Sequence, residues 1–194
     1  NWVDNSCVSE NVFIIANEIL DAIPSKIFHK EDNKFYEKCI IEEEGNLAFS
    51  LKDCNGNYLK EIHSIEDRLN RKLPNSYTFE INMRIESFLL NIFKNSKNFL
   101  LMIIDYGYHE DEFFHPQRKN GTVQFYKNHK KINDIFSFQQ GSFDISISVN
   151  FSNIYRIAKS NSIELYSYTT QSEFLLNMNI LELAKEIEGN SERN

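Results

Sequence analysis

The sequence predicts an α/β fold with a mostly parallel sheet and an antiparallel β insertion after the first strand. Residues 12–16 and 99–104 are apolar without alternation, which is typical of strands buried on both faces of a parallel sheet. Between them, an apolar stripe at helical spacing runs from Ile81 to Phe93 and predicts a helix that packs on the sheet. This pattern indicates a doubly wound domain.

Polar residues follow both apolar runs at the points where the strands end. Asn17 and Glu18 come directly after the first run, and Asp105 comes after the second. The carboxyl ends of parallel strands line the ligand crevice of such a sheet, so we expect these side chains to lie at a common edge. Other roles stay open. Asp105 could cap a turn that bends at Gly107, Glu18 could simply be solvated, and Asp21 could cap a helix after the first strand.

The composition is that of an ordinary globular protein, and we treat residues 1–194 as a single domain. The 194 residues are 41% hydrophobic and 25% charged. A formal charge of -7 argues against a nucleic-acid surface, because phosphate binding needs clustered cations. No apolar run is long enough for a transmembrane helix, so no membrane insertion is predicted. The odd number of cysteines, 3, indicates a reducing compartment without a disulfide framework.

Residues 26–62 form the predicted β insertion. Short β-prone runs separated by turn residues predict an antiparallel meander, which is either a plain edge sheet or a surface that grips a partner. From Thr78 the apolar period is helical, which places Glu80 in the first turn of the predicted helix. There its charge suits the helix dipole, or its side chain points into the crevice.

The segment after the second buried strand is predicted to be a loop over the site. Residues 110–121 are polar and aromatic and end in turn residues. Irregular histidine spacing without a nearby cysteine argues against a metal site. We also predict a strand at 122–126, a helix capped by Asn150, a strand at 163–168, a helix with a Thr170 and Glu173 capping box, and a tail at 183–194.

Six short blocks occur in an order that resembles one protein family. They are ANEILDAIP (16–24), TFEIN (78–82), IDYGY (104–108), HPQR with GT (115–118 and 121–122), DIS with VNF (144–146 and 149–151), and YTTQSEFL (168–175). In this register they look like the MidA family of S-adenosylmethionine-dependent methyltransferases, which includes a mitochondrial assembly factor for respiratory complex I. The resemblance covers roughly residues 12 to 180.

This resemblance implies a Rossmann-like class I methyltransferase sheet with S-adenosyl-L-methionine as cofactor. Family members carry a glycine-rich loop upstream of the segment that matches residues 12–24. The chain starts at Asn1 and contains no G-x-G-x-x-G pattern, so we expect a C-terminal fragment that lacks half of the cofactor site. The resemblance further implies protein-arginine N-methylation of a subunit of respiratory complex I (NADH dehydrogenase), and thus a protein substrate. A homodimer is possible.

Carboxylates around an arginine acceptor would fix the guanidinium plane and accept the released proton. The candidate catalytic residues are Asn17, Glu18, Asp21, Glu80 and Asp105. The candidate substrate-binding residues are Tyr106, His115, Gln117 and Arg118. Asn17 and Glu18 are also the candidate cofactor-binding residues, and no metal ligand is proposed.

A non-catalytic assembly or binding protein that keeps the methyltransferase fold is the alternative function. An intact upstream glycine-rich loop followed by an acidic residue would favour the enzyme, and a degenerate loop would favour the binding protein. The bacterial cytoplasm and the mitochondrial matrix are both reducing, and both fit the chain.

Overall fold

The computed structural model describes the backbone of residues 11–191 and the side chains as far as residue 185. The chain divides into two compact units, one ending at Ile157 and the other beginning at Ala158. Each unit is described by itself. Within the described residues, every helix falls short of the length or the hydropathy that a membrane-spanning segment needs.

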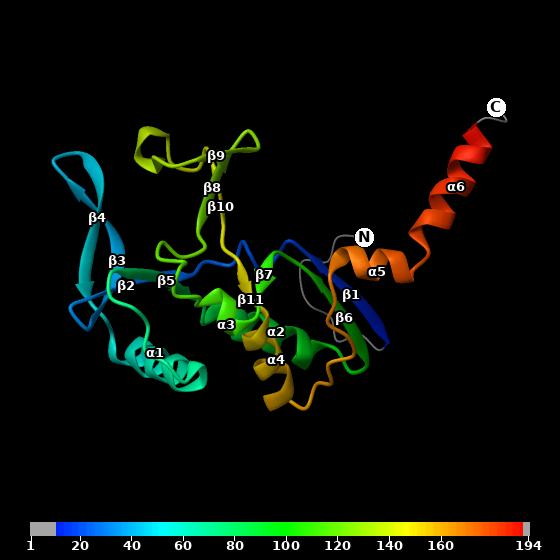
Figure 1. Ribbon diagram of the computed structural model, residues 1–194, viewed down its shortest axis with the longest axis horizontal. Helices are drawn as coiled ribbons and strands as arrows, with labels where there is room; N and C mark the ends of the chain where they lie inside the picture. The colour runs from blue at the N-terminus through cyan, green and yellow to red at the C-terminus, as the bar shows by residue number, and fades with distance from the viewer. Residues whose placement is uncertain (1–10, 192–194) are drawn as a thin grey trace. The chain divides into compact units, whose positions relative to one another are not determined.

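The two apolar runs form neighbouring parallel strands, as predicted. Strand β1 (Val12–Asn17) pairs with β6 (Phe99–Ile104), with Val12 opposite Phe99 and Asn17 opposite Ile104. Figure 1 shows the two strands side by side. Because they point the same way, the residues that follow Asn17 and Ile104 leave the sheet at the same edge.

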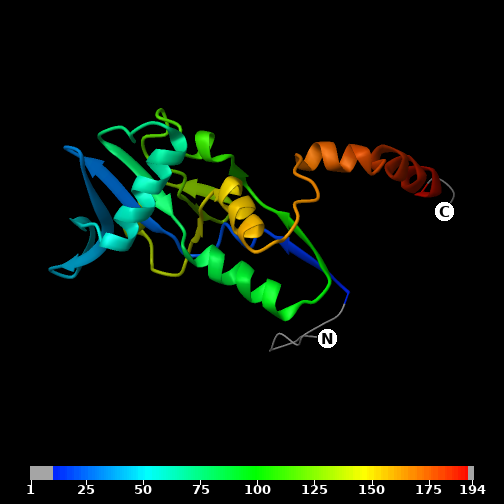
Figure 2. The same ribbon diagram turned by 90° about the horizontal axis from the view of Figure 1, so that it is seen from below.

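One face of this strand pair packs on helices and the other is exposed. Leu101 and Ile103 contact a buried cluster that includes Leu89 of α2 (Arg84–Asn95) and Ile157 of α4 (Phe151–Ser160). Figure 2 shows α2 alongside the strands. On the opposite face, Phe13, Ile15 and Leu100 are each more than half exposed. The expectation of burial on both faces is therefore wrong for the described residues, because helices cover one face only.

A four-stranded antiparallel sheet in the order β4-β3-β2-β5 forms the other large part of the first unit. It contains β2 (Lys26–Glu31), β3 (Lys34–Glu43), β4 (Asn46–Asp53) and β5 (Tyr77–Ile81). The predicted meander is confirmed for β2, β3 and β4. The β structure of the insertion ends at Asp53, because Asn55 caps helix α1 (Gly56–Leu69) by accepting a hydrogen bond from the Asn57 amide.

Glu80 lies in a strand and not in the first turn of a helix, which corrects the prediction. It is opposite Ile27 in the β2–β5 pair. Helix α2 begins only at Arg84, after Asn82, whose side-chain oxygen accepts hydrogen bonds from the amides of Arg84 and Ile85. Tyr77, Phe79 and Ile81 are buried, so the alternation of a strand had merged with the apolar stripe of the helix.

The remaining elements of the first unit are short. They are β7 (Gly107–Tyr108), α3 (Glu110–Phe113), β8 (Gln124–Lys127), β9 (Lys130–Ile132), the 3-10 turn η1 (Ile135–Ser137), β10 (Asp144–Ser146) and β11 (Val149–Asn150). Strand β11 pairs parallel with β7, whereas β10-β8-β9 is antiparallel. The expected mostly parallel sheet is therefore wrong for the described residues: parallel and antiparallel pairs are mixed. Asn150 caps α4 as predicted, since its side chain accepts from the Asn153 amide.

The second unit is helical. The segment 163–168, predicted as a strand, has no β partner in the described part of the chain and is irregular. Helix α5 (Gln171–Asn177) starts at the predicted cap, where the Thr170 hydroxyl oxygen accepts from the Glu173 amide. Helix α6 (Ile180–Ser191) occupies most of the predicted tail, and residues 192–194 lie outside the described residues.

A buried ion pair joins α1 to the antiparallel sheet. Lys30 and Glu66 are 5% and 3% exposed. The Lys30 Nζ donates to the Leu73 carbonyl at 2.6 Å and to Glu66 Oε1 at 3.4 Å, and Glu66 also accepts from the exposed Lys72. Burial alone would raise the pKa of Glu66, but these donors outweigh it and the pKa is lowered. Its contribution to stability is therefore present above the unfolded pKa and is lost as the pH falls through the folded pKa.

Replacing Glu66 with Gln should lower the free energy of unfolding of the full-length protein by about 3 kcal/mol, because the Lys30 ammonium stays buried without its counter-charge. It should also weaken the loss of stability at acidic pH, because the titrating carboxylate is gone. Urea unfolding at neutral and acidic pH measures both effects. Lys72→Gln is the matched control, since it removes only the exposed partner of the same carboxylate. Equal losses in the two variants would contradict the buried-pair explanation.

Candidate functional site

The edge where β1 and β6 end brings together most of the acidic residues expected there. The Glu18 amide donates to the Ile104 carbonyl at 2.8 Å, so the backbone after β1 stays beside the end of β6. Asn17 and Glu18 are exposed at this edge, and Asp105 is half-buried. These three residues therefore lie at one edge of the strand pair, as the sequence predicts.

The Asp105 carboxylate organises the loop that leaves β1. Its Oδ2 accepts from the amides of Leu20 at 2.9 Å and Asp21 at 3.2 Å, and its Oδ1 accepts from the Tyr106 amide at 2.9 Å. Burial and the nearby charge of Asp21 raise the pKa of Asp105 despite these donors. The turn-capping role considered from the sequence is present, and it coexists with a position at the site.

Asp21 faces the same edge with one oxygen still open. Its Oδ2 accepts from the hydroxyl of Ser146 in β10 at 2.9 Å, and its carbonyl accepts from the Ile147 amide. Among the described residues, its buried Oδ1 has no hydrogen-bond partner. No helix follows β1, so the interpretation of Asp21 as a helix cap is wrong. A buried carboxylate oxygen without a donor favours a ligand that brings one.

Tyr106 connects the two strand ends through its side chain. Its hydroxyl donates to Glu18 Oε1 at 3.0 Å, while 63% of the residue is exposed. The hydrogen bond and the charge of Glu18 raise the pKa of the Tyr106 phenol. Glu18 itself has φ of 48°, in the left-handed region that most residues avoid, so this turn is held by its surroundings.

Glu80 is not part of this edge. It is 3% exposed, and its carboxylate accepts from the Thr122 amide and hydroxyl at 3.0 Å and from the Val123 amide at 3.4 Å. Gly121 has φ of +72°, and a Cβ there would lie 2.0 Å from Glu80 Oε1. The position of Glu80 corrects the expectation that it points into the crevice. Its donors instead hold the segment around Thr122 against β5.

The loop after α3 holds the remaining predicted residues. His115 and Gln117 are exposed, and the Gln117 amide donates to His115 Nδ1. The Arg118 guanidinium lies over the Tyr108 ring, 4.1 Å from its centre. Arg118 is thus close to the strand that follows Asp105. The other two make local contacts, and their substrate-binding role stays a prediction.

Two further residues matter that the sequence reasoning did not select. Ser146 binds Asp21, and Glu110 receives hydrogen bonds from two arginines. Ser146 lies in one of the blocks that carry the family resemblance, and that position is the signal that could have identified it. No group of three or more His, Cys, Asp or Glu side chains in the described part of the chain is arranged to hold a metal ion. Cys39 and Cys54 are free thiols, and Cys7 lies outside the described residues.

A family model described as "Putative S-adenosyl-L-methionine-dependent methyltransferase" matches residues 1–169 of the chain. The chain belongs to this methyltransferase family. It is similar to the protein named "Protein arginine methyltransferase NDUFAF7 homolog, mitochondrial" of Caenorhabditis elegans, with 25% identity over 171 residues. That match covers 86% of this chain and 37% of the relative.

Two crystal structures from Burkholderia thailandensis share the fold. One is a superfamily member bound to S-adenosyl-homocysteine, with a TM-score of 0.87 and 24% identity over all of this chain and 49% of the other. The second is a native structure of an uncharacterized superfamily protein, with a TM-score of 0.86 and 24% identity, covering all of this chain and 50% of the other. The chain therefore spans about half the length of these structural relatives.

Proposed function

We propose that the full-length protein is an S-adenosyl-L-methionine-dependent methyltransferase that methylates an arginine side chain of a protein. A subunit of a respiratory NADH dehydrogenase is the acceptor that the family resemblance implies. Family membership supports the reaction class, and the Caenorhabditis elegans relative, named as a protein arginine methyltransferase, supports the acceptor. The observation that carries the proposal is the convergence of Glu18, Asp21 and Asp105 at one strand edge.

This edge suits a guanidinium. Asp21 Oδ1 is a buried acceptor that lacks a partner among the described residues, and a guanidinium has five N–H donors with a fixed positive charge. Burial and the negative charge of Asp21 raise the pKa of Asp105, so the two carboxylates repel each other at this edge. A cation placed against them would satisfy the open oxygen and relieve the repulsion.

The residues where β1 ends fit the amino-acid part of the cofactor. Asn17 offers an amide, Glu18 a carboxylate and Ile19 an apolar surface that is 40% exposed. The Glu18 carboxylate suits the ammonium group of the cofactor, the Asn17 amide can donate to its carboxylate, and Ile19 suits its carbon chain. When bound, S-adenosyl-L-methionine supplies an electrophilic methyl group carried on a sulfonium. In this chain, Asn17 and Glu18 are the residues that would hold it.

Positioning and proton acceptance are the tasks left to the carboxylates. Asp21 and Asp105 orient the guanidinium through hydrogen bonds, which supplies most of the acceleration in an in-line displacement. As an arginine nitrogen forms its new bond to carbon, the carbon–sulfur bond breaks and the nitrogen must lose a proton. Asp105 is the acceptor we propose, because burial and the charge of Asp21 raise its pKa and make its carboxylate a better base than an ordinary aspartate.

Isothermal titration of the full-length protein with S-adenosyl-homocysteine tests the placement of the cofactor. Replacing Asn17 with Ala should weaken binding at least about tenfold, because a hydrogen-bonding group at the site is lost. Asn91→Ala on the exposed surface of α2 is the matched control and should bind like the wild type. Unchanged affinity in Asn17→Ala would defeat the placement. Tight binding without methyl transfer to any arginine would favour the non-catalytic assembly protein instead.

A further inference from the structure

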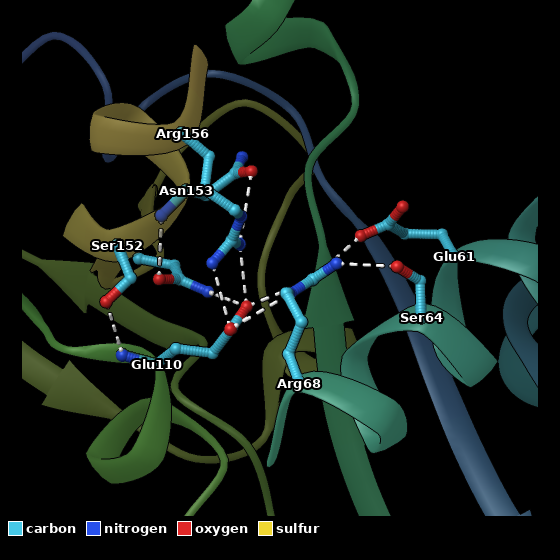
Figure 3. A network of polar contacts seen from close by, with 8 residues as sticks. Glu61, Ser64, Arg68, Glu110, Ser152, Asn153 and Arg156 are labelled. Atoms are coloured by element: carbon cyan, nitrogen blue, oxygen red, sulfur yellow. Dashed lines mark hydrogen bonds and ion pairs between the residues drawn. The ribbon is translucent and has the colours of Figure 1, made fainter. Parts of the chain in front are cut away.

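Glu110 is a buried carboxylate held by two guanidinium groups. It is the first residue of α3, shortly after Asp105 and β7, and is 7% exposed. Arg68 donates to it through Nε at 3.1 Å and Nη2 at 3.0 Å, and Arg156 through Nη1 at 2.9 Å and Nη2 at 2.6 Å. Figure 3 shows both forks converging on the one carboxylate. Two bidentate pairs fix both the position and the plane of this group.

Arg68 and Glu110 make further hydrogen bonds beside the two forks. Arg68 also donates to Ser64 Oγ at 2.7 Å and to Glu61 at 3.1 Å, all on α1. The backbone amide of Glu110 donates to Ser152 Oγ at 3.0 Å, at the start of α4. Burial alone would raise the pKa of Glu110, but the hydrogen bonds from both arginines lower it, so the carboxylate stays ionised at neutral pH.

These contacts join two separate hydrophobic cores. Ile62 and Ile65 of α1 belong to the core beneath the antiparallel sheet. Ile157 of α4 belongs to the core that covers β1 and β6. Figure 1 shows α3 between these two helices. Glu110 therefore links α1 and α4, which carry its two arginine partners, to the segment between Asp105 and Glu110.

The segment between Asp105 and Glu110 is held at both ends. Asp105 is fixed by three backbone amides at the strand edge. In the middle, β7 pairs with β11, and the Val149 amide donates to the Tyr106 carbonyl at 2.7 Å. At the far end, Glu110 is bound by Arg68 and Arg156. Loss of that anchor would let β7 shift relative to β11, and Tyr106 and Asp105 would move with it.

We propose that Glu110 is a positioning residue that holds Asp105 and Tyr106 in the orientation needed at the strand edge. This inference rests on the proposed methyl transfer. Because Glu110 is buried and its carboxylate is bound by Arg68 and Arg156, the proposal gives it no direct contact with the acceptor or the cofactor. A desolvated ion pair adds little net stability compared with apolar packing, whereas its forked geometry specifies one arrangement of the helices that carry it.

Kinetics of the full-length enzyme, with isolated NADH dehydrogenase subunits as acceptors, separate positioning from folding. Glu110→Gln should lower kcat at least about tenfold while the Kd of S-adenosyl-homocysteine changes less than twofold. Arg68→Lys keeps the charge and loses the fork, so a folded variant with a smaller loss of kcat is expected. Glu61→Gln, which contacts Arg68 but not Glu110, is the control and should match the wild type.

Amide hydrogen exchange of residues 105–110 tests, independently of activity, whether Glu110 holds this segment in place. Faster exchange there in Glu110→Gln and Arg68→Lys, with the core of α2 still protected, supports the positioning role. Unchanged exchange, or a kcat loss that disappears when the variant is assayed at a temperature where it is fully folded, overturns it. A wild type that methylates no arginine would defeat the proposed function, and the exchange result would still decide whether Glu110 anchors this segment.

Discussion

Replacing Asp105 with Asn should lower methyl transfer by the full-length protein by at least about 100-fold, the usual cost of removing one preorganised electrostatic group from an active site. The loss has two sources. The neutral amide is a poor proton acceptor and a weaker partner for a guanidinium. The amide also has an NH₂ group in place of one carboxylate oxygen. Both oxygens of Asp105 accept from backbone amides, Oδ2 from Leu20 and Asp21 and Oδ1 from Tyr106, so the NH₂ group would face another donor.

The raised pKa of Asp105 also predicts how stability and methyl transfer change with pH. Because the folded pKa of Asp105 is raised, its contribution to stability is full below the ordinary pKa and is lost as the pH rises through the raised value. Over the same range the carboxylate forms, so methyl transfer should increase with pH while stability decreases. Both trends should vanish in Asp105→Asn. Rate profiles and thermal melts across this range measure them.

Asp111→Asn is the matched control for Asp105→Asn. Its carboxylate is on the surface, with the side chain 85% exposed, and pairs with Arg71 at 3.3 Å. It should keep the wild-type rate and pH profile. Transfer by Asp105→Asn within threefold of wild type, in a protein that melts like the wild type, would remove Asp105 from the proposed chemistry.

The position of the candidate strand-end site could be predicted from the sequence because it depends on short local patterns. An unbroken apolar run identifies each strand, and the polar residues come where the run stops, so the pairing of β1 with β6 alone brings Asn17 and Asp105 to one edge. The hydrogen bond that fixes the other carboxylate oxygen of Asp21, Oδ2, comes instead from Ser146, 125 positions away in the chain. No spacing rule connects residues that meet only through the tertiary fold.

The surroundings of Glu80 and Glu110 could not be predicted from the sequence. The apolar stripe of α2 continues into the alternating pattern of β5, so the two elements could not be separated and Glu80 was predicted to lie in the first turn of a helix. Glu110 looked like one member of an acidic loop. Its arginine partners lie 42 and 46 positions away on two different helices. Only the packing of those helices converts an ordinary surface pattern into a buried carboxylate.

Gly107→Ala is expected to damage stability and activity together. A Cβ on Gly107 would lie 2.1 Å from the Val149 carbonyl oxygen and 2.7 Å from the Phe151 ring. The carbonyl belongs to β11, the partner of β7, so it cannot move aside as a flexible side chain would. Overpacking of this kind costs about 3 kcal/mol of unfolding free energy. Relief requires β7 and β11 to separate, which breaks the bond from the Val149 amide to the Tyr106 carbonyl.

Urea unfolding and methyl transfer of the full-length protein test this steric prediction together. The surviving folded fraction of Gly107→Ala should transfer methyl groups at least about tenfold more slowly, because Asp105 and Tyr106 move with the separated strand. Gly56→Ala is the matched control: it adds the same methyl group where nothing lies within 4 Å, at the start of α1, and should be neutral or slightly stabilising. If both alanine variants unfold and react alike, the close approach of β7 to β11 does not position the strand-end carboxylates.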